Sequence, residues 1–245
     1  MRLRRATRRV SEVGDGIRAS NGAWTFGGDV PANFDDHIAR SIPSYAACHE
    51  LVVDIADHLV PAHGRCYDLG CSTGVLTARL AERLAARGAE VIGIDREPGM
   101  VQLAGERCAQ LPSVRFESTA LEDLDFTRAD LVVSYYTLQF VPIAYRQQVV
   151  DRIARSLRPS GALLLFEKVL APTARDQEMA AGVYADWKRR QGYGDDEIGA
   201  KSRSLRGVLS PLSHDENEAM LRRAGFTQIA QVFRWMIFEG LLARV

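Results

Sequence analysis

The sequence has no excess of charge of either sign. Its 245 residues include 31 lysines and arginines and 31 aspartates and glutamates, so the formal net charge is zero. A neutral chain has no overall attraction for a polyanion, which makes a nucleic-acid partner unlikely on sequence grounds. The basic run in residues 2–9 has no interleaved aromatic residues, and we expect it to be a solvated tail.

Long hydrophobic runs are also absent. No segment approaches the roughly 18 consecutive apolar residues that a membrane-spanning helix needs, and no apolar signal-peptide core follows the basic start. We therefore expect a cytoplasmic protein with no membrane partner. With 47% hydrophobic and 25% charged residues, the composition is that of a globular chain with one substantial core.

Cysteines are few, and their spacing argues against a metal site or a disulfide framework. Cys48, Cys66, Cys71 and Cys108 form no C-x-x-C pair and have no histidine at a zinc-ligand interval. We expect reduced thiols, no disulfide and no metal.

The sequence does contain a strand, a glycine-rich turn, a helix and a second strand that ends on an acid. The turn at 68–74 has the sequence Asp-Leu-Gly-Cys-Ser-Thr-Gly, and Asp95 follows the apolar run 90–94. This order is typical of a nucleotide site in an α/β sheet. Gly70 and Gly74 would let the backbone approach a ligand, and Asp95 is placed to accept hydrogen bonds from ribose hydroxyls.

The acid at the start of the turn indicates which nucleoside binds. A dinucleotide site uses G-x-G-x-x-G to place a pyrophosphate at a helix N-terminus, whereas here Asp68 stands two residues before Gly70. Asp68 would repel a phosphate and suits a cation, such as the amino or sulfonium group of S-adenosylmethionine. The turn resembles the first motif of class I methyltransferases, D-x-G-x-G-x-G, with Ser72 in place of the middle glycine.

The same turn also matches the G-x-S-x-G nucleophile elbow of α/β hydrolases, with Ser72 as the nucleophile. That elbow normally follows several strands, but residues 66–69 are the first strand that we expect in this chain. The only histidine after Ser72 is His214, which follows Ser213 in a polar run that indicates a helix N-cap. We therefore weigh the hydrolase interpretation far below the nucleoside site.

Strand and helix patterns alternate from residue 65 onward. The expected strands are 66–69, 90–94, 114–117, 130–135, 162–167, 227–236 and 239–244. The expected helices are 32–41, 45–60, 75–87, 98–110, 144–157, 175–191, 195–209 and 216–224. This alternation predicts a doubly wound α/β fold of the Rossmann-like type, with a mostly parallel seven-stranded sheet. The last two strands are so close in sequence that they must form an antiparallel pair.

The chain also suggests a division into an arm and a single domain. Residues 1–30 are polar and glycine-bearing, and we expect a flexible N-terminal arm in which Trp24 folds over the pocket. Residues 31–245 form the expected S-adenosylmethionine-binding domain. A helical insert at about 172–210 would form a lid over the acceptor site.

Motifs spread along the chain together resemble a narrower family, the carboxy-S-adenosyl-L-methionine synthases. These motifs are 23–26, 38–45, 67–72, 136–140, 161–168, 192–193, 197–198, Lys201 and 224–226. The resemblance runs from about Trp24 to the C-terminus. It implies an enzyme that binds S-adenosylmethionine and takes carbon dioxide from prephenate to carboxylate it, and the family's product modifies wobble uridine in tRNA through a partner enzyme.

Position in the sheet and the resemblance together select the candidate site residues. The cofactor-binding candidates are Tyr45, Asp68, Gly70, Cys71, Ser72, Gly74, Asp95, Arg96, Ala120, Leu121 and Tyr135. The catalytic candidates are Tyr135, Tyr136 and Arg203. The substrate-binding candidates are Arg40, Lys168, Tyr193 and Arg203. None of the histidines at 37, 49, 58 and 63 has a partner at catalytic spacing in the sequence, and a structural role at the helix start is expected for His214.

Three departures from the family pattern fall in the expected pocket. The family supplies an arginine from the helical insert to the new carboxylate, and the matching position here is Ser202; Arg203 is next to it, but one helical step turns a side chain by about 100 degrees. An acid that contacts the adenine is replaced by Ala120, and an asparagine is replaced by Tyr135. The resemblance with these departures implies a retained cofactor and altered chemistry.

The sequence therefore favours an S-adenosylmethionine-dependent methyltransferase that acts on a small-molecule acceptor and forms a homodimer. The cofactor would be S-adenosylmethionine or S-adenosylhomocysteine, with the carboxylated form as another candidate. Two alternatives remain open: carboxy-S-adenosylmethionine synthesis, and a binding protein that keeps the nucleoside pocket but performs no chemistry.

Overall fold

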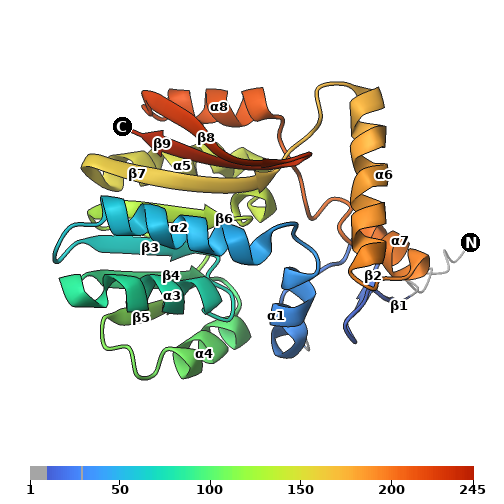
Figure 1. Cartoon of the computed structure of the whole chain (residues 1–245), viewed down its shortest axis with the longest axis horizontal. Coiled ribbons are helices and arrows are strands. Elements are labelled where there is room, and N and C mark those ends of the chain that lie inside the picture. The colour runs from blue at the N-terminus through green and yellow to red at the C-terminus, as the bar shows by residue number, and fades with distance from the viewer. Residues whose placement is uncertain (1–9, 29) are drawn as a thin grey trace, which may run out of the picture.

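Seven strands form a single sheet in the order β5-β4-β3-β6-β7-β9-β8 (Figure 1). The computed structural model describes residues 10–28 and 30–245, so the basic run at 2–9 and that part of the expected arm lie outside the described residues. The strands are β3 (Arg65–Leu69), β4 (Glu90–Asp95), β5 (Val114–Ser118), β6 (Ala129–Tyr135), β7 (Leu157–Lys168), β8 (Gln228–Trp235) and β9 (Phe238–Arg244). Strands β3 to β7 are parallel, and β9 is antiparallel to both of its neighbours. The predicted doubly wound sheet with its antiparallel pair is confirmed.

Helices cover both faces of this sheet because its central strands are apolar on both sides. Helices α2 (Tyr45–Leu59) and α3 (Val75–Leu84) pack on one face, and α5 (Ile143–Ser156) and α8 (His214–Arg223) pack on the other. The short helix η1 (Ala85–Arg87) extends α3, and α4 (Pro98–Arg107) lies beside α3. The helices on each face form an apolar core with the sheet, and these two cores hold β3 and β6 in place. A functional site can therefore form at the carboxyl ends of these strands.

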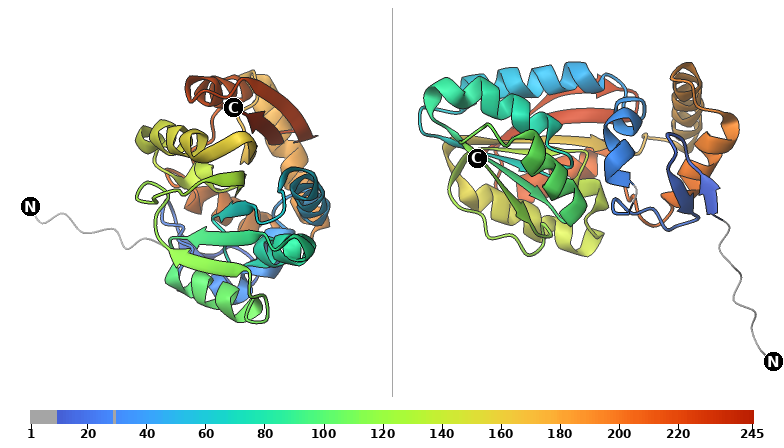
Figure 2. Two further views of the ribbon diagram at one scale, coloured as in Figure 1. Left: turned by 90° about the vertical axis from the view of Figure 1, so that its left-hand side faces the viewer. Right: turned by 90° about the horizontal axis from the view of Figure 1, so that it is seen from below.

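The remaining elements gather at the carboxyl end of the parallel strands (Figures 1 and 2). They are the hairpin β1 (Val10–Glu12) and β2 (Arg18–Ser20), α1 (Val30–Ala39), the short helix η2 (Leu138–Phe140), and the two lid helices α6 (Ala174–Arg190) and α7 (Asp195–Ser204). A third apolar cluster joins the hairpin to α1, α4 and α7. The end of the sheet that would open to solvent is therefore covered by both early and late parts of the chain.

Residues 10–28, which belong to the expected arm, contact the lid helices in this arrangement. The backbone N–H of Gly22 donates to the carbonyl of Arg203 at 3.0 Å, and that of Trp24 donates to Ser204 at 3.1 Å. Gly14 has a φ of +99°, and the ring of Tyr193 packs against it so closely that a Cβ would collide. A two-stranded hairpin is marginal alone in water, so contact with the lid stabilises it.

Two elements have bounds that differ most from the sequence expectation. Helix α7 ends at Ser204 instead of continuing to residue 209, and β7 begins at Leu157 instead of residue 162. The early start of β7 follows from a bulged pairing with β6, in which Ala129 faces Leu157. Ser160 adopts a φ of 68° inside this segment, which a single-sequence pattern does not indicate.

Several properties expected from the sequence can be compared with the described residues. Residues 10–28 and 30–245 include no helix that is long and apolar enough to cross a membrane. The four cysteines are buried and unpaired. In the same residues no group of three or more histidine, cysteine or acidic side chains is arranged to hold a metal ion.

Candidate active site

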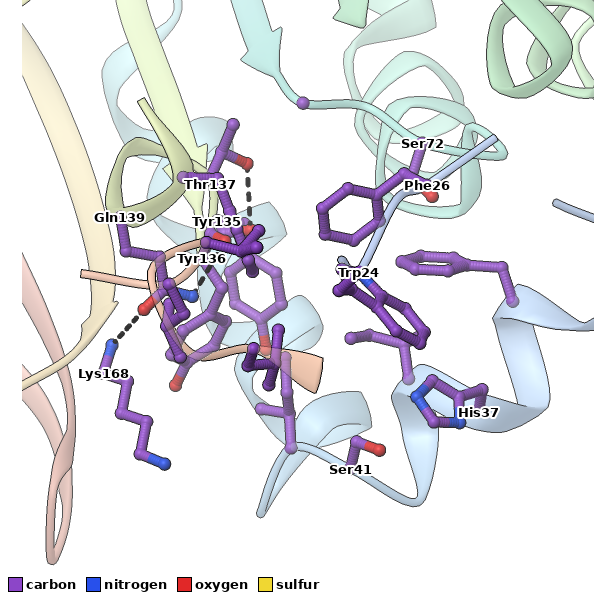
Figure 3. Close-up of a pocket in the computed structure, with 18 of the residues that line it drawn as sticks. Trp24, Phe26, His37, Ser41, Ser72, Tyr135, Tyr136, Thr137, Gln139 and Lys168 are labelled. Carbon is purple, nitrogen blue, oxygen red and sulfur yellow. Dashed lines mark hydrogen bonds between the residues drawn. The ribbon is translucent and has the colours of Figure 1, made fainter. Parts of the chain in front are cut away.

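A cavity of about 740 Å³ lies between the carboxyl ends of β3, β4 and β6 and the lid helices. Figure 3 shows Tyr135, Tyr136, Gln139 and Lys168 on one side of this cavity and Trp24, Phe26 and His37 on the other. Its walls therefore combine residues of the sheet with residues of the arm and α1.

The glycine-rich turn forms one end of the cavity. Gly70 has a φ of +69°, and a Cβ at this position would collide with the side chain of Thr137. Ser72 also adopts a left-handed conformation, with a φ of 54°. The backbone N–H of Ser72 donates to Oδ2 of Asp95 at 2.9 Å, and the N–H of Glu97 donates to Oδ1 at 3.0 Å. The carboxylate is thus fixed at the cavity wall and keeps lone pairs for a ribose diol.

Asp68 is buried at the start of the same turn. Its Oδ2 accepts a hydrogen bond from the hydroxyl of Thr77 at 2.6 Å. Burial raises the pKa of the Asp68 carboxyl to about 6, against the opposing effect of that hydrogen bond. A nearby cation would favour the ionised form, so the site suits a positively charged ligand group.

Aromatic rings line the cavity beyond the turn. The Tyr135 ring lies 5.8 Å from that of Tyr45 and 4.9 Å from that of Tyr136, between ring centroids. The hydroxyl of Tyr135 donates to the carbonyl of Tyr45 at 3.3 Å. Tyr136 follows directly after β6 with a φ of 57°, a conformation that non-glycine residues rarely adopt and that often marks functional sites. These rings exclude water from the part of the cavity next to the glycine-rich turn, which is the expected nucleoside end.

Three lysines lie at the lid end of the cavity. Lys188 and Lys201 are buried and Lys168 is half-buried, and none of them forms an ion pair with a carboxylate among the described residues. The amine of Lys168 lies 4.7 Å from the centroid of the Tyr184 ring, and that of Lys188 lies 4.9 Å from the Tyr193 ring. Burial lowers the pKa of Lys168 and of Lys188 to about 8 and that of Lys201 well below its usual value. An anion bound between them would supply the missing countercharge.

Most of the residues predicted from the sequence line this cavity. Those that do are Tyr45, Asp68, Gly70, Cys71, Ser72, Asp95, Arg96, Ala120, Leu121, Tyr135, Tyr136 and Lys168. Gly74 does not line it, but it begins α3 with a φ of +79° and leaves no room for a Cβ against Ala104.

Three predicted substrate residues lie outside the cavity lining. Arg40 forms an ion pair with Asp15, and the hydroxyl of Tyr193 donates to the same carboxylate. Arg203 does not line the cavity, whereas its neighbour Ser202 does, as expected when one helical step turns a side chain by about 100 degrees. Arg206, just beyond the end of α7, lines the cavity instead. A role of Arg203 in binding a carboxylate therefore stays an untested prediction.

The structure adds lining residues that the sequence did not single out for the site. Among them are His37 and Lys188, together with Lys201, which the sequence places only on the lid. His37, which has no partner at catalytic spacing in the sequence, has one in the structure, because its Nδ1 lies 2.7 Å from Oδ2 of Asp15. Nothing in the sequence indicates this pair, which lies 22 positions apart and meets only when the hairpin docks.

The chain is similar in sequence to known proteins over most of its length. The sequence model of a methyltransferase domain family matches residues 67–161. The carboxy-S-adenosyl-L-methionine synthase of Wolinella succinogenes is 37% identical over 88% of this chain and 90% of its own length. The synthase of Staphylococcus epidermidis is 35% identical over 90% of this chain and 96% of its own. The chain belongs to the carboxy-S-adenosyl-L-methionine synthase family.

Solved structures agree on the fold of this family member. The YcgJ protein from Bacillus subtilis superposes with a TM-score of 0.58 at 20% identity, over 78% of this chain and 72% of its own. Human N-acetylserotonin methyltransferase, solved in complex with S-adenosylmethionine, superposes with a TM-score of 0.57 at 16% identity, over 86% of this chain and 54% of its own. The class I methyltransferase fold is confirmed. This member of the synthase family is an S-adenosylmethionine-dependent transferase that binds S-adenosylmethionine or S-adenosylhomocysteine.

The raised pKa of Asp68 leads to a prediction on pH. If Asp68 faces a cationic part of the cofactor, affinity for S-adenosylmethionine falls as the pH is lowered through about 6, because protonation removes the negative charge. Calorimetric titrations between about pH 5 and about pH 8 would measure this. Asp68→Asn should bind more weakly and lose most of the pH dependence. An unchanged pH profile in that variant would assign the effect to another group.

Proposed function

We propose that this protein carboxylates the methyl group of S-adenosylmethionine and takes the carboxyl group from an anionic, prephenate-type donor. The observation that carries the proposal is the group of Lys168, Lys188 and Lys201, which line one cavity without a carboxylate partner among the described residues. Membership of the synthase family supports it. The preference drawn from the sequence, methyl transfer to a small-molecule acceptor, becomes the second candidate.

The lysines can supply the positive charge that is missing at Ser202. Replacement of the family's arginine would leave a carboxylate beside the sulfonium without a cation. Lys201 precedes Ser202 in α7, and Lys188 reaches the same end of the cavity from α6. Together they offer several N–H donors to one or two carboxylates, so the site does not depend on an arginine at position 202.

Other residues of the cavity bind the cofactor and exclude water. When bound, the cofactor supplies an activated methyl group. Asp95 fixes the nucleoside and Asp68 holds its cationic part, while the rings of Tyr45 and Tyr135 exclude water. A prephenate-type donor loses its carboxyl group as carbon dioxide when that C–C bond breaks, and its ring hydroxyl leaves as hydroxide while the ring becomes aromatic. The methyl carbon gives one proton to that hydroxide, which leaves as water, and forms a C–C bond to the carbon dioxide. The lysines hold the carboxyl donor close to that carbon.

Methyl transfer remains a specific second candidate because of Tyr135. A phenol replaces the family's smaller amide at this position and lines the cavity. It narrows the space next to the nucleoside end, which would orient an acceptor for in-line attack on the methyl group. The acceptor would still be an acid, since the same three lysines face it.

One assay separates the candidates. Purified protein is incubated with S-adenosylmethionine and prephenate, and the cofactor is analysed by mass spectrometry. Carboxylation predicts a cofactor heavier by the mass of carbon dioxide, which requires prephenate. Release of S-adenosylhomocysteine with an acidic acceptor would instead support methyl transfer, and tight binding without either product would support a binding protein. Native mass spectrometry of the same sample would test the expected homodimer.

A further inference from the structure

A carboxylate from the arm fixes one histidine of the cavity. Asp15 stands at the turn of the β1–β2 hairpin with a φ of 58°, and its side chain is 4% exposed. Its Oδ2 lies 2.7 Å from Nδ1 of His37, and it also pairs with Arg40 and accepts the hydroxyl of Tyr193. Because a carboxylate only accepts hydrogen bonds, the proton of a neutral His37 is on Nδ1.

The imidazole of His37 is neutral in this setting. Burial, together with the smaller effect of the positive charges of Lys201 and Lys188, lowers the pKa of His37 to about 3. Arg40 balances the charge of Asp15, so that carboxylate does little to favour an imidazolium. His37 therefore offers a bare lone pair on Nε2 and cannot act as a cation.

That lone pair has no partner within the described part of the chain. His37 is 1% exposed and lines the cavity, and its Nε2 is a buried polar atom without a hydrogen bond there. The same holds for the indole N–H of Trp24, whose ring stacks on that of His37 with centroids 5.7 Å apart. Figure 3 shows the two rings side by side at the cavity wall. An orphaned acceptor and an orphaned donor thus lie together, and buried polar atoms normally have partners.

We propose that His37 selects for a hydroxyl group on the anionic carboxyl donor. A hydroxyl can donate to Nε2 of His37 and accept from the indole N–H of Trp24, which satisfies both orphaned atoms. An ammonium donor is disfavoured because Lys188 and Lys201 face the same space. Asp15 is the positioning residue, because it fixes the tautomer that leaves Nε2 free to accept. The identity of the donor rests on the proposed function, whereas the tautomer and the preference for a hydroxyl do not.

Nitrogen-15 NMR of protein labelled in histidine and tryptophan tests the inference without turnover. His37→Gln identifies the His37 signals, and the ligand-free protein should show the Nδ1–H tautomer. Addition of 3-(4-hydroxyphenyl)propionate, whose hydroxyl is at the ring position of the hydroxyl in prephenate, should shift the His37 Nε2 and Trp24 indole signals in the presence of S-adenosylhomocysteine. 3-Phenylpropionate, which lacks the hydroxyl, should leave them largely in place. The opposite tautomer, equal shifts with both acids, or no shift with either would overturn the inference.

Variants extend the test to the reaction. His37→Phe should raise KM for prephenate about tenfold, the cost of one hydrogen bond, with an unchanged Kd for S-adenosylmethionine. His37→Gln keeps a hydrogen-bond acceptor at this position and should return KM most of the way to the wild-type value. His58→Phe, at an exposed site on α2, is the matched control. A KM in His37→Phe equal to that of the wild type would overturn the inference. A wild-type protein that makes no carboxylated product would overturn only the proposed function, because the NMR comparison still applies.

Discussion

Asp95→Ala should weaken the binding of S-adenosylmethionine by about 100-fold or more. Two ribose hydroxyls donating to a carboxylate contribute about 1.5–3 kcal/mol each, and 100-fold corresponds to about 2.7 kcal/mol. The substitution also removes the acceptor for the backbone N–H groups of Ser72 and Glu97, so the turn itself loses its anchor. Calorimetry or equilibrium dialysis would measure the change in Kd.

Two variants serve as controls for this loss. Asp95→Asn keeps one acceptor oxygen and should show an intermediate Kd. Asp125→Ala removes an exposed acid from the loop after β5 and should leave binding unchanged. A Kd for Asp95→Ala within about threefold of the wild type would show that the ribose is held elsewhere, since even one hydrogen bond to a carboxylate contributes more than that.

Lys188→Met should have opposite effects on activity and on stability. Loss of a charge-assisted hydrogen bond to the carboxyl donor, worth about 1.5–3 kcal/mol, should raise KM for prephenate about 10- to 150-fold. The free energy of unfolding should rise by about 1–3 kcal/mol, because a buried cation without a partner is replaced by an apolar side chain of similar length. Steady-state kinetics and chemical denaturation of the ligand-free protein measure the two quantities.

The stability effect of Lys188 should also depend on pH. The folded-state pKa of Lys188, about 8, is below its usual value of 10.5, so between these pH values the unfolded chain binds more protons. Stability of the wild type therefore gains with rising pH across this window, and the gain is present in full above it. Lys188→Met should lose that part of the slope.

Arg190→Met is the matched control for Lys188→Met. Arg190 is exposed and lies two residues further along α6, on another face of the helix. Its substitution should leave both KM and stability nearly unchanged, because surface charges contribute little. If Lys188→Met destabilised the protein and left KM unchanged, the lysine would have a structural role and the anion site would be wrong.

The parts of the site that depend on local sequence could be predicted. Asp68, Gly70 and Asp95 act through a turn and a strand end, and their spacing is fixed by the βαβ unit itself. The order of strands followed from alternating patterns and from the close spacing of the last two strands. These features need only a few neighbouring residues to be recognised.

The lid end of the cavity could not be predicted in the same way. Asp15 meets His37 and Tyr193 only through tertiary packing, and the strands of its hairpin have three residues each, too few to show a period. Arg203 and Arg206 are the same residue type, so the sequence does not show which of them lines the cavity. That depends on where α7 ends, and the end of a helix is the least certain property of a sequence pattern. Lys188 and Lys201 look like solvated helix residues until the helices are placed.

The contacts of Gly22 and Trp24 with α7 also bear on how the protein is made. During synthesis the hairpin leaves the ribosome early, but residues 203 and 204, to which it hydrogen-bonds, follow about 180 positions later. Strand β9, which lies between β7 and β8 in the sheet, follows both of them in the sequence. The nucleoside end of the cavity can be complete once β6 has emerged, whereas the wall that holds Trp24 and His37 together must wait for the final quarter of the chain. A nascent chain halted before α7 would therefore have the glycine-rich turn but no closed cavity.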